Sequence, residues 1–340
     1  MAAVFFPGEW CPQSAIQIAW PHRDTDWVDD LEGVTACYVS LSKEILRREK
    51  LLVVCPDANE VRDYFSHNEQ ENLICVEIAS NDTWARDHGA LSLFVDGVPT
   101  IVDFGFNGWG LKFAANHDNL ITGKLYGKAV FQREVAYRNQ LDFVLEGGSV
   151  ESDGKGTLLT TAQCLLAPNR NQPMSCEEID DFLKKSLGVQ HILWLHHGYL
   201  AGDDTDSHVD TLARFCDEDT IAYVKCEDPQ EEHYEELAAM EKELKAFVTS
   251  DGRPYRLIDL PMADAAYCDG ERLPATYANF LIINGAVLIP FYNTQKDEVA
   301  KRQLQKAFPD RDIIGIDCRP LIRQHGSLHC VTMQFPIGFL

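Results

Sequence analysis

Residues 145–161 read LEGGSVESDGKGTLLTT, and the interpretation of the fold begins with this stretch. Glu146 and two glycines come just before one apolar segment, and 153–156 has the composition of a turn that leads into a second segment at 157–161. The Gly-Lys-Gly is not typical of a phosphate-binding loop, because the G-K-[ST] order and the upstream glycine are missing. The stretch therefore predicts a β-hairpin that begins beside a carboxylate.

Strand and helix signals alternate on both sides of this hairpin. Short apolar runs predict strands at 51–55, 73–78, 91–95, 157–161, 192–195, 220–224 and 280–283. Longer amphipathic periods predict helices at 34–49, 177–187, 231–247 and 296–308. Ser175 with Glu178 forms a capping-box pattern, and Gly188 is a plausible helix stop. This interleaving predicts an α/β protein.

Polar residues recur beside the predicted strands at intervals of roughly 60 residues. They are Asp87, Glu146, His208, Asn279 and the pair His329 and Cys330. A period of this kind is typical of repeated units arranged around an axis, each offering polar side chains to a shared centre. Chance recurrence in a long α/β chain is the alternative.

The composition is globular and strongly acidic. Apolar residues make up 45% and charged residues 24% of the 340 residues, and the formal net charge is −23. Such a charge repels nucleic acid and anionic membranes and attracts small cations. An acidic surface that only favours solubility is the alternative. A cationic ligand suits this chain better than a phosphate or a carboxylate.

The eleven cysteines are scattered, and none forms a C-x-x-C pair. This pattern argues against a disulfide framework and a zinc site, so most of the thiols are expected to be buried apolar groups. The first ten residues lack the basic and apolar regions of a secretory signal, and the longest apolar runs are much shorter than a membrane span. We therefore expect a cytoplasmic protein without a metal.

Two short motifs carry candidate chemistry. His208 and Asp210 lie two residues apart, so in a strand both side chains point to one side; a metal site and plain packing are the alternatives. Cys330 follows His325 and His329, which could lower the pKa of its thiol; a buried structural cysteine is the alternative.

Ten segments, taken in order, resemble the agmatine deiminase family, which belongs with the bacterial-type peptidylarginine deiminases. The segments are GEW at 8–10, WPHR at 20–23, WARD at 84–87, DFGFNGWG at 103–110, LEGGS at 145–149, GTLLTT at 156–161, PNRN at 168–171, GDDTDSHVD at 202–210, PATYANF at 274–280 and HC at 329–330. Any one of them is weak. The ordered set spans nearly the whole chain.

The resemblance implies a fold and a reaction. The family fold is a fivefold pseudosymmetric α/β propeller of the pentein kind, so residues 1–340 are expected to form a single domain with the active site on its axis. The implied reaction is hydrolytic deimination of agmatine to N-carbamoylputrescine and ammonia through a covalent cysteine thiouronium, without cofactor or metal. The alternative is a deiminase acting on free or peptidyl arginine or another substituted guanidine. The implied partner is a small guanidinium cation, and a homo-oligomer is possible.

The resemblance also implies a role for each matched residue. Cys330 is the nucleophile, His208 the general acid and base, and Glu146 the group that holds His208. The guanidinium is gripped by two carboxylates, Asp87 and Asp210. The remaining candidates bind substrate: Trp84 and Trp109 wall the pocket, and Asp203 or Asp204 pairs with the ammonium at the far end of agmatine.

The sequence departs from the family pattern at a few pocket positions. Ser207 replaces a usual glycine, His88 replaces a common threonine, and 324–328 replaces a stretch of three glycines and an asparagine. These departures leave the choice among agmatine, arginine and peptidyl arginine open. A cation-binding protein without catalysis and a metallohydrolase are rival classes, but a binder has no need of an intact nucleophile.

Overall fold

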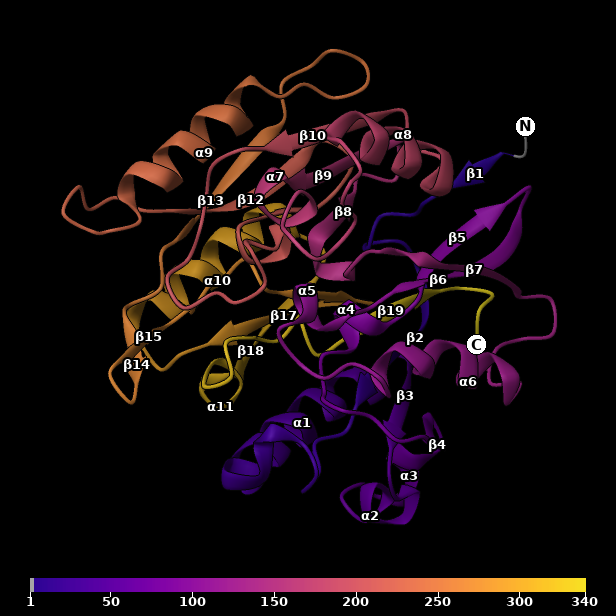
Figure 1. Ribbon diagram of the computed structural model, residues 1–340. Coiled ribbons are helices and arrows are strands. Elements are labelled where there is room, and N and C mark those ends of the chain that lie inside the picture. Colours follow the sequence, from indigo (N-terminus) through magenta and orange to yellow (C-terminus); the bar gives the residue numbers. More distant parts are fainter. Residues whose placement is uncertain (1–2) are drawn as a thin grey trace.

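The computed structural model describes residues 3–340, and most strands in that range fall into sheets of three or four (Figure 1). Two sheets hold four strands each: β1 (Val4–Phe5), β5 (Leu91–Val95), β6 (Val98–Gly105) and β7 (Ala136–Val144), then β19 (Met333–Pro336), β2 (Gln13–Ala19), β3 (Lys50–Cys55) and β4 (Leu73–Glu77). Three sheets hold three strands each. The first consists of β8 (Val150–Ser152), β9 (Thr157–Thr161) and β10 (His191–Leu195), and the second of β11 (Ala213–Phe215), β12 (Thr220–Lys225) and β13 (Arg256–Pro261). The third consists of β16 (Leu281–Ile283), β17 (Ala286–Phe291) and β18 (Asp312–Asp317). A separate hairpin consists of β14 (Ala266–Cys268) and β15 (Glu271–Leu273).

These five larger sheets share one pairing pattern. A middle strand pairs antiparallel with one neighbour and parallel with the strand that follows it in the chain, as β9 does with β8 and β10. A parallel pair needs a crossover, and a helix supplies it each time. The crossover helices are α1 (Leu31–Leu46), α6 (Ile121–Gly127), α8 (Cys176–Leu187), α9 (Tyr234–Ala246) and α10 (Gln295–Ala307).

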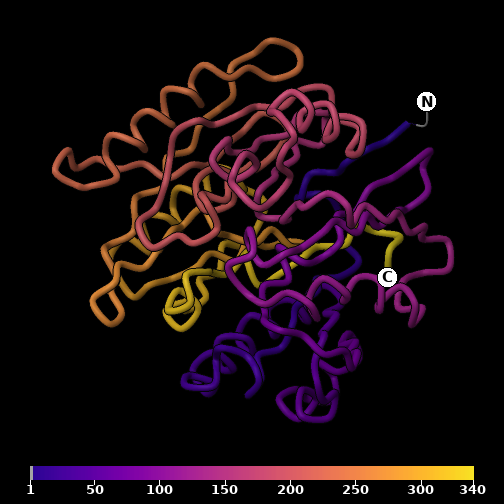
Figure 2. Tube along the Cα trace, viewed as in Figure 1, coloured from indigo at the N-terminus to yellow at the C-terminus, as the bar shows by residue number. Residues whose placement is uncertain are grey.

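The two ends of the chain complete one sheet together. β19, near the C-terminus, pairs antiparallel with β2, near the N-terminus, and β2 pairs parallel with β3. The colours of Figure 2 show this closure, since the yellow segment runs beside the indigo one. The unit that opens the chain is therefore finished by its last strand.

The local signals of the sequence account for the main elements. All seven predicted strands and all four predicted helices form, and no boundary is shifted by more than three residues. Helix α8 begins at the capping box of Ser175 and Glu178 and ends at Gly188, whose φ of 71° is left-handed. Residues 153–156 connect β8 and β9 as the predicted hairpin turn.

Short helical segments occur between the strands and the longer helices. They are η1 (Asp26–Asp30), α2 (Ala58–Arg62), α3 (His67–Gln70), α4 (Ala85–His88), α5 (Gly108–Leu111), η2 (Asp118–Leu120), η3 (Gly147–Ser149), α7 (Ala162–Leu165), η4 (Val209–Thr211) and α11 (Arg319–Ile322). Helices α4 and α5 lie near the centre of Figure 1, whereas α1, α8 and α9 lie toward its outside.

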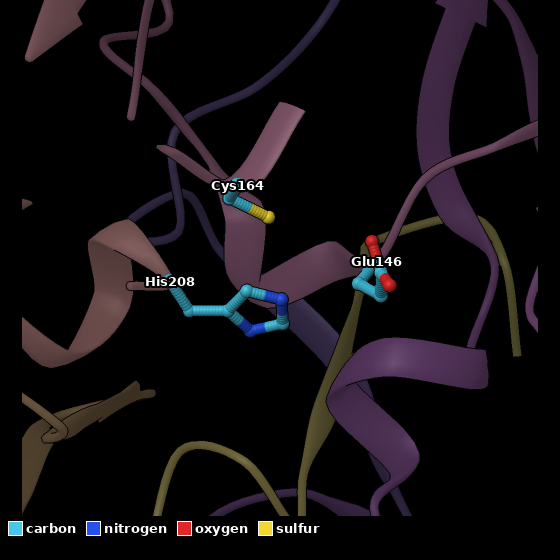
Figure 3. Close-up of side chains that lie close together, drawn as sticks. All are labelled: Glu146, Cys164 and His208. Atoms are coloured by element: carbon cyan, nitrogen blue, oxygen red, sulfur yellow. The ribbon is translucent and has the colours of Figure 1, made fainter. Parts of the chain in front are cut away.

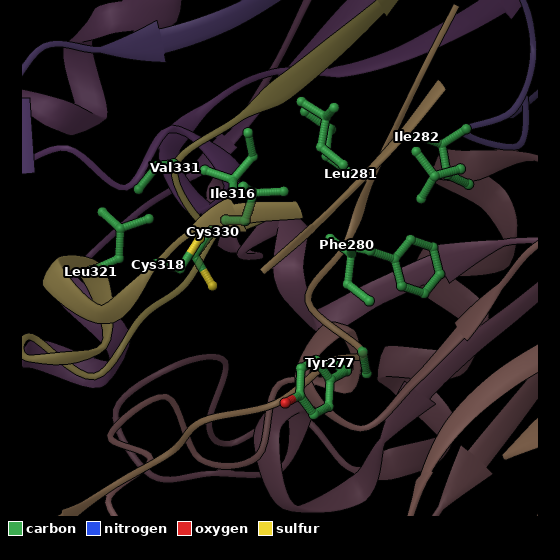
Figure 4. Close-up of a cluster of buried hydrophobic side chains, with 14 of the residues drawn as sticks. Tyr277, Phe280, Leu281, Ile282, Ile316, Cys318, Leu321, Cys330 and Val331 are labelled. Carbon is green, nitrogen blue, oxygen red and sulfur yellow. The ribbon is translucent and has the colours of Figure 1, made fainter. Parts of the chain in front are cut away.

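The largest hydrophobic core reaches the backbone of Cys330. Figure 4 shows Cys330 among Ile316, Leu321 and Val331, which belong to the same buried cluster. Because Val331 is fully buried and Cys330 is 6% exposed, the thiol is held at the edge of a close-packed interior. No helix within residues 3–340 is both long and apolar enough to cross a membrane.

Candidate active site

Asp87 lies in the single turn α4, directly after Trp84 and before β5. Its Oδ2 accepts a hydrogen bond of 2.9 Å from Trp109 Nε1, and its Oδ1 accepts one of 3.1 Å from Gly148 N. The turn itself is tied to the end of the chain, since Arg86 N donates to the Cys330 carbonyl at 3.0 Å. These contacts fix a buried carboxylate beside the thiol.

Trp109 is held in an unusual conformation. Its φ of 54° and ψ of 51° are left-handed, which is costly for a tryptophan, and Gly110 N donates to Asn107 Oδ1 at 2.9 Å to close the turn. The strained backbone turns the indole N–H toward Asp87, as the 2.9 Å hydrogen bond shows.

His208 and Asp210 lie before strand β11 and not in a strand, so the alternation of a strand does not place their side chains. Residues 209–211 form the turn η4, closed by a 3.2 Å bond from Thr211 N to the His208 carbonyl. The reason is the preceding backbone: Asp206 and Ser207 are left-handed, with φ of 66° and 63°, and reverse the chain before a strand can form. Both side chains still reach the same centre.

Gly148 marks that centre. A Cβ added to it would lie 2.6 Å from His208 Nδ1, 2.9 Å from Asp87 Oδ1 and 3.2 Å from Asp210 Oδ1. Three side chains from two separate segments of the chain therefore converge on one glycine, which leaves them the space a methyl group would fill. This close approach explains the glycine at position 148, the second of the two that follow Glu146.

Burial and mutual charge set the pKa values of these groups. Burial raises the pKa of Asp87 to about 6, with Asp210 adding to the rise and His208 opposing it. Burial by itself would lower the pKa of His208, but Asp87, Cys164 and Glu146 raise it well above the usual value. Burial would raise the pKa of Asp210, yet His329 and His208 hold it below the usual value. The carboxylates of Asp87 and Glu146 therefore favour the charged form of His208, whose Nδ1 lies 3.6 Å from Asp87 Oδ1.

Cys330 has a thiol that resists ionisation. Burial, Asp210 and Asp87 together raise its pKa well above the usual value, so the expectation that His325 and His329 lower it is wrong. The physical reason is direction: both nitrogens of His329 face carboxylates, and His325 Nδ1 lies 2.6 Å from the Gly202 carbonyl. A cation bound beside Asp87 and Asp210 would offset the charge that suppresses the thiolate.

Glu146 lies close to His208, together with a second thiol. Figure 3 shows the His208 ring near both Cys164 and Glu146, and the three residues offer atoms within 4.8 Å of one another. Arg170 Nε donates to both oxygens of Glu146 at 2.9 and 3.1 Å, and Arg170 Nη1 lies 2.6 Å from Asp206. Arg170 thereby holds the carboxylate that faces the imidazole.

A cavity of about 270 Å³ leads to the thiol. Six candidate residues line it: Trp84, Asp87, Trp109, Asp203, Asp204 and Cys330. His208, Asp210 and Glu146 are not among its lining residues and are almost fully buried. Larger hollows of about 400 and 450 Å³ lie elsewhere, but none of the convergent groups lines them.

The cavity has aromatic walls and further carboxylates. Trp84 packs on Gly326, where an added Cβ would meet the indole ring at 2.1 Å. Asp26 and Asp82 add to the acidic lining, and burial raises the pKa of Asp82 to about 6. The cavity therefore suits a narrow, flat cation more than an anion.

The two adjacent candidates Asp203 and Asp204 differ in what they contact. Asp203 accepts bonds from Thr205 N at 3.2 Å, Thr205 Oγ1 at 2.5 Å and Ser207 N at 2.6 Å, so both its oxygens brace the loop. No such bond engages the side chain of Asp204 within residues 3–340, and burial and Asp203 raise its pKa. Asp204 is the better placed of the two to meet a ligand.

Two groups of buried residues have the spacing of metal ligands: Glu146, Cys164 and His208, and Glu9, Glu151 and His329. In each group an arginine already bonds a carboxylate, Arg170 in the first and Arg214 in the second. The protein thus supplies the positive charge that a cation would bring.

Asn279 received no role from the sequence, although the repeat marked its position. Its Oδ1 accepts from His329 N at 2.9 Å, from Cys330 N at 3.3 Å and from Cys330 Sγ at 3.4 Å. Its Nδ2 lies 3.4 Å from the Asp210 carbonyl. Asn279 therefore joins Cys330 to η4. Arg170 and Glu9 were also missed, though both lie in motifs that were recognised.

The departures from the family pattern have different positions. His88 is buried against Phe106, with ring centroids 6.2 Å apart, and burial lowers its pKa to about 4; it does not line the cavity. Ser207 donates its N–H to Asp203. Only the departure at 324–328 reaches the cavity, through Gln324, His325 and Gly326.

The chain is similar to known deiminases in both sequence and structure. The model of the Porphyromonas-type peptidyl-arginine deiminase family matches residues 5–336. An agmatine deiminase of Pseudomonas aeruginosa is 32% identical over 354 residues, covering 97% of this chain and 95% of that protein. A substrate-bound agmatine deiminase of C. jejuni is 37% identical with a TM-score of 0.93, covering 100% of this chain and 98% of that one.

Two more solved structures bear on substrate and fold. One from Porphyromonas gingivalis, provisionally named an arginine deiminase, is 58% identical with a TM-score of 0.96 and covers 99% of both chains. A dimethylarginine dimethylaminohydrolase of Pseudomonas aeruginosa is 11% identical with a TM-score of 0.52, covering 95% of this chain and 100% of that one. At that identity the likeness concerns the fold alone, a mixed α/β fold shared with that enzyme.

Proposed function

This chain belongs to the Porphyromonas-type peptidyl-arginine deiminase family, and on that premise we propose that it hydrolyses agmatine to N-carbamoylputrescine and ammonia. The reaction breaks a C–N bond of a linear amidine. One observation carries the proposal: the Cys330 thiol and Asp87 line an acidic, aromatic-walled cavity, and the buried His208 and Asp210 meet Asp87 around Gly148.

Binding uses the two carboxylates. A guanidinium presents planar N–H groups, and Asp87 Oδ1 and Asp210 Oδ1 lie side by side around Gly148 to accept them. Buried carboxylates without a cation are costly, which favours a cationic ligand over a neutral one. The bound charge also lowers the pKa of the Cys330 thiol, so the thiolate forms where its target is present.

The chemistry then takes two stages. Cys330, having lost its proton to water, attacks the guanidinium carbon and forms a C–S bond; His208 protonates the departing nitrogen, the C–N bond breaks, and ammonia leaves. Water next attacks the thiouronium carbon while His208 takes its proton. The C–S bond then breaks, the remaining hydroxyl proton passes to the solvent, the carbamoyl product leaves, and the thiolate returns. Glu146, held by Arg170, stabilises the charged form of His208.

The mouth of the cavity selects the far end of the substrate. Asp204, Asp82 and Asp26 favour the ammonium of agmatine and repel the carboxylate of free arginine. Of the adjacent acids, we assign the ammonium contact to Asp204, because Asp203 is engaged by its own loop. Arginine is the second candidate, supported by the name of the 58% identical structure from Porphyromonas gingivalis.

We also infer that the five sheets surround one axis as a fivefold pseudosymmetric propeller within a single domain. The support is the pairing pattern that all five share and the closure of β19 onto β2. The candidate residues come from positions between these sheets, as units around a common centre require.

Ammonia release from agmatine, arginine and an arginyl peptide tests the function. The wild type is expected to act on agmatine with the highest kcat/KM, and Cys330→Ser to be inactive. No release by the wild type from any of the three substrates, or full activity of Cys330→Ser, would refute the proposal. If kcat/KM is higher for arginine than for agmatine, arginine is the substrate.

A further inference from the structure

A row of buried charges lies behind Asp210. His329 Nδ1 is 2.7 Å from Asp210 Oδ2, and His329 Nε2 is 2.7 Å from Glu9 Oε2. All three side chains are at most 5% exposed. His329 therefore bridges two carboxylates that lie far apart in the sequence, and it does so next to the nucleophile Cys330 without bonding its sulfur.

Glu9 is a fixed anchor for this bridge. Its Oε2 also accepts from Arg214 Nη2 at 2.8 Å, and its Oε1 accepts from Ile282 N at 2.8 Å. Arg214 is held in turn by Glu151 at 2.7 Å and lies over the Phe280 ring at 4.6 Å. With the backbone of β16 and a buried arginine both bonded to it, Glu9 has little freedom to move.

The hydrogen-bond inventory decides how His329 is protonated in this arrangement. An ionised carboxylate only accepts, and each ring nitrogen faces one, so both nitrogens donate. Asp210 Oδ2 is thereby occupied. Its Oδ1 has no hydrogen-bond partner within residues 3–340 and points to the space beside Gly148, where Asp87 Oδ1 and His208 Nδ1 also lie.

We propose that His329 is a positioning residue for deimination: it donates one N–H to Asp210 and the other to Glu9, and so turns Asp210 Oδ1 toward the substrate guanidinium. The inference rests on the proposed function, since only a guanidinium uses that oxygen. Without the bridge, a buried carboxylate beside Asp87 would rotate or take up a proton, and half of the cation grip would be lost.

Two isosteric variants separate the two hydrogen bonds. The amide nitrogen of His329→Asn occupies the place of Nδ1 and can still donate to Asp210, whereas that of His329→Gln occupies the place of Nε2 and can donate only to Glu9. Each variant removes one bond and the charge, so a purely structural role predicts similar activity losses and similar Tm values for both. The positioning role predicts that they differ in activity.

The experiment measures kcat/KM for agmatine from pH 5.5 to 9.5, together with Tm, for the wild type and both variants. With the imidazolium gone, the pKa of Asp210 rises, so the acid limb of His329→Asn should move to higher pH and its activity should recover to within about tenfold of the wild type at pH 9. His329→Gln has no donor for Asp210, so its loss of roughly a hundredfold should persist at every pH.

Equal losses in the two variants with an unshifted acid limb would overturn the proposal. If His329→Gln does not fold, His329→Asn alone decides, because a loss that stays constant with pH contradicts the positioning role. The wild type separates this proposal from the proposed function: inactivity of the wild type on agmatine refutes deimination itself, whereas an active wild type with indistinguishable variants refutes only the role of His329.

Discussion

Gly148→Ala tests whether the catalytic groups really meet at one point. The added Cβ would lie 2.6 Å from His208 Nδ1 and 2.9 Å from Asp87 Oδ1, against an ordinary contact that begins near 3.4 Å. Gly148 N also donates to Asp87, and alanine keeps that N–H. The substitution therefore perturbs the positions of the reacting groups without removing a hydrogen bond or a charge.

The expected size of the effect follows from the overlap. To restore contact at 3.4 Å, the His208 ring must retreat by about 0.8 Å and the Asp87 carboxylate by about 0.5 Å. A misplacement of about 1 Å in a catalytic constellation costs roughly a hundredfold in rate, or about 2.7 kcal/mol of transition-state stabilisation. Overpacking of the buried site should also cost about 1–3 kcal/mol of stability.

The assay compares kcat/KM for agmatine and Tm in Gly148→Ala, the wild type and a control. Gly127→Ala is the matched control, because a Cβ at that position meets nothing within 4 Å. The control should behave as the wild type in both measurements. If Gly148→Ala retains kcat/KM within about threefold of the wild type while folded, then the three groups do not converge in the working enzyme and the geometry is wrong.

Three further outcomes follow from the site. Asp204→Asn should raise KM for agmatine about tenfold with little change in kcat, the size of one charge-assisted hydrogen bond, whereas Asp203→Asn should lower Tm; an unchanged KM for Asp204→Asn removes its role. The acid limb of kcat/KM should lie near pH 6, because the pKa of Asp87 is raised to about 6 and its carboxylate forms only as the pH rises through that value. A wild-type profile flat down to pH 5 contradicts this. Each alkylation rate of Cys330 is divided by the rate of the same reagent with free cysteine. By this measure, cationic 2-chloroacetamidine should react at least about tenfold faster than neutral iodoacetamide, because its charge offsets Asp87 and Asp210. Equal normalised rates for the two reagents contradict this prediction.

Local signals were sufficient for most of the secondary structure. Apolar runs and caps act over a few residues, so the strand at 157–161 and the helix between Ser175 and Gly188 could be predicted from their own neighbourhoods. The turn η4, for which nothing was predicted, also has a local cause in the left-handed backbone of Asp206 and Ser207. A His-Val-Asp stretch by itself carries no sign of that backbone.

The candidate site, too, was predicted in part from the sequence and in part only seen in the structure. The motifs supplied candidate side chains, and the structure brings Asp87, His208 and Asp210 around Gly148 with Cys330 beside them. Asn279 and Arg170 escaped notice because their roles consist of contacts with residues far along the chain. A periodic sequence pattern cannot predict a hydrogen bond between two segments that come together only after folding.

From the sequence alone came the α/β pattern, the family and the proposal that Cys330 is the nucleophile, because these depend on residue types and their order. Only the tertiary structure decided what His329 faces and how readily Cys330 ionises. Adjacency in the chain suggested that His329 activates the thiol, but folding turns its ring to Asp210 and Glu9 and buries the thiol beside two carboxylates. Burial and nearby charges set the pKa of a side chain, and both depend on the folded structure and not on the adjacent residues in the sequence.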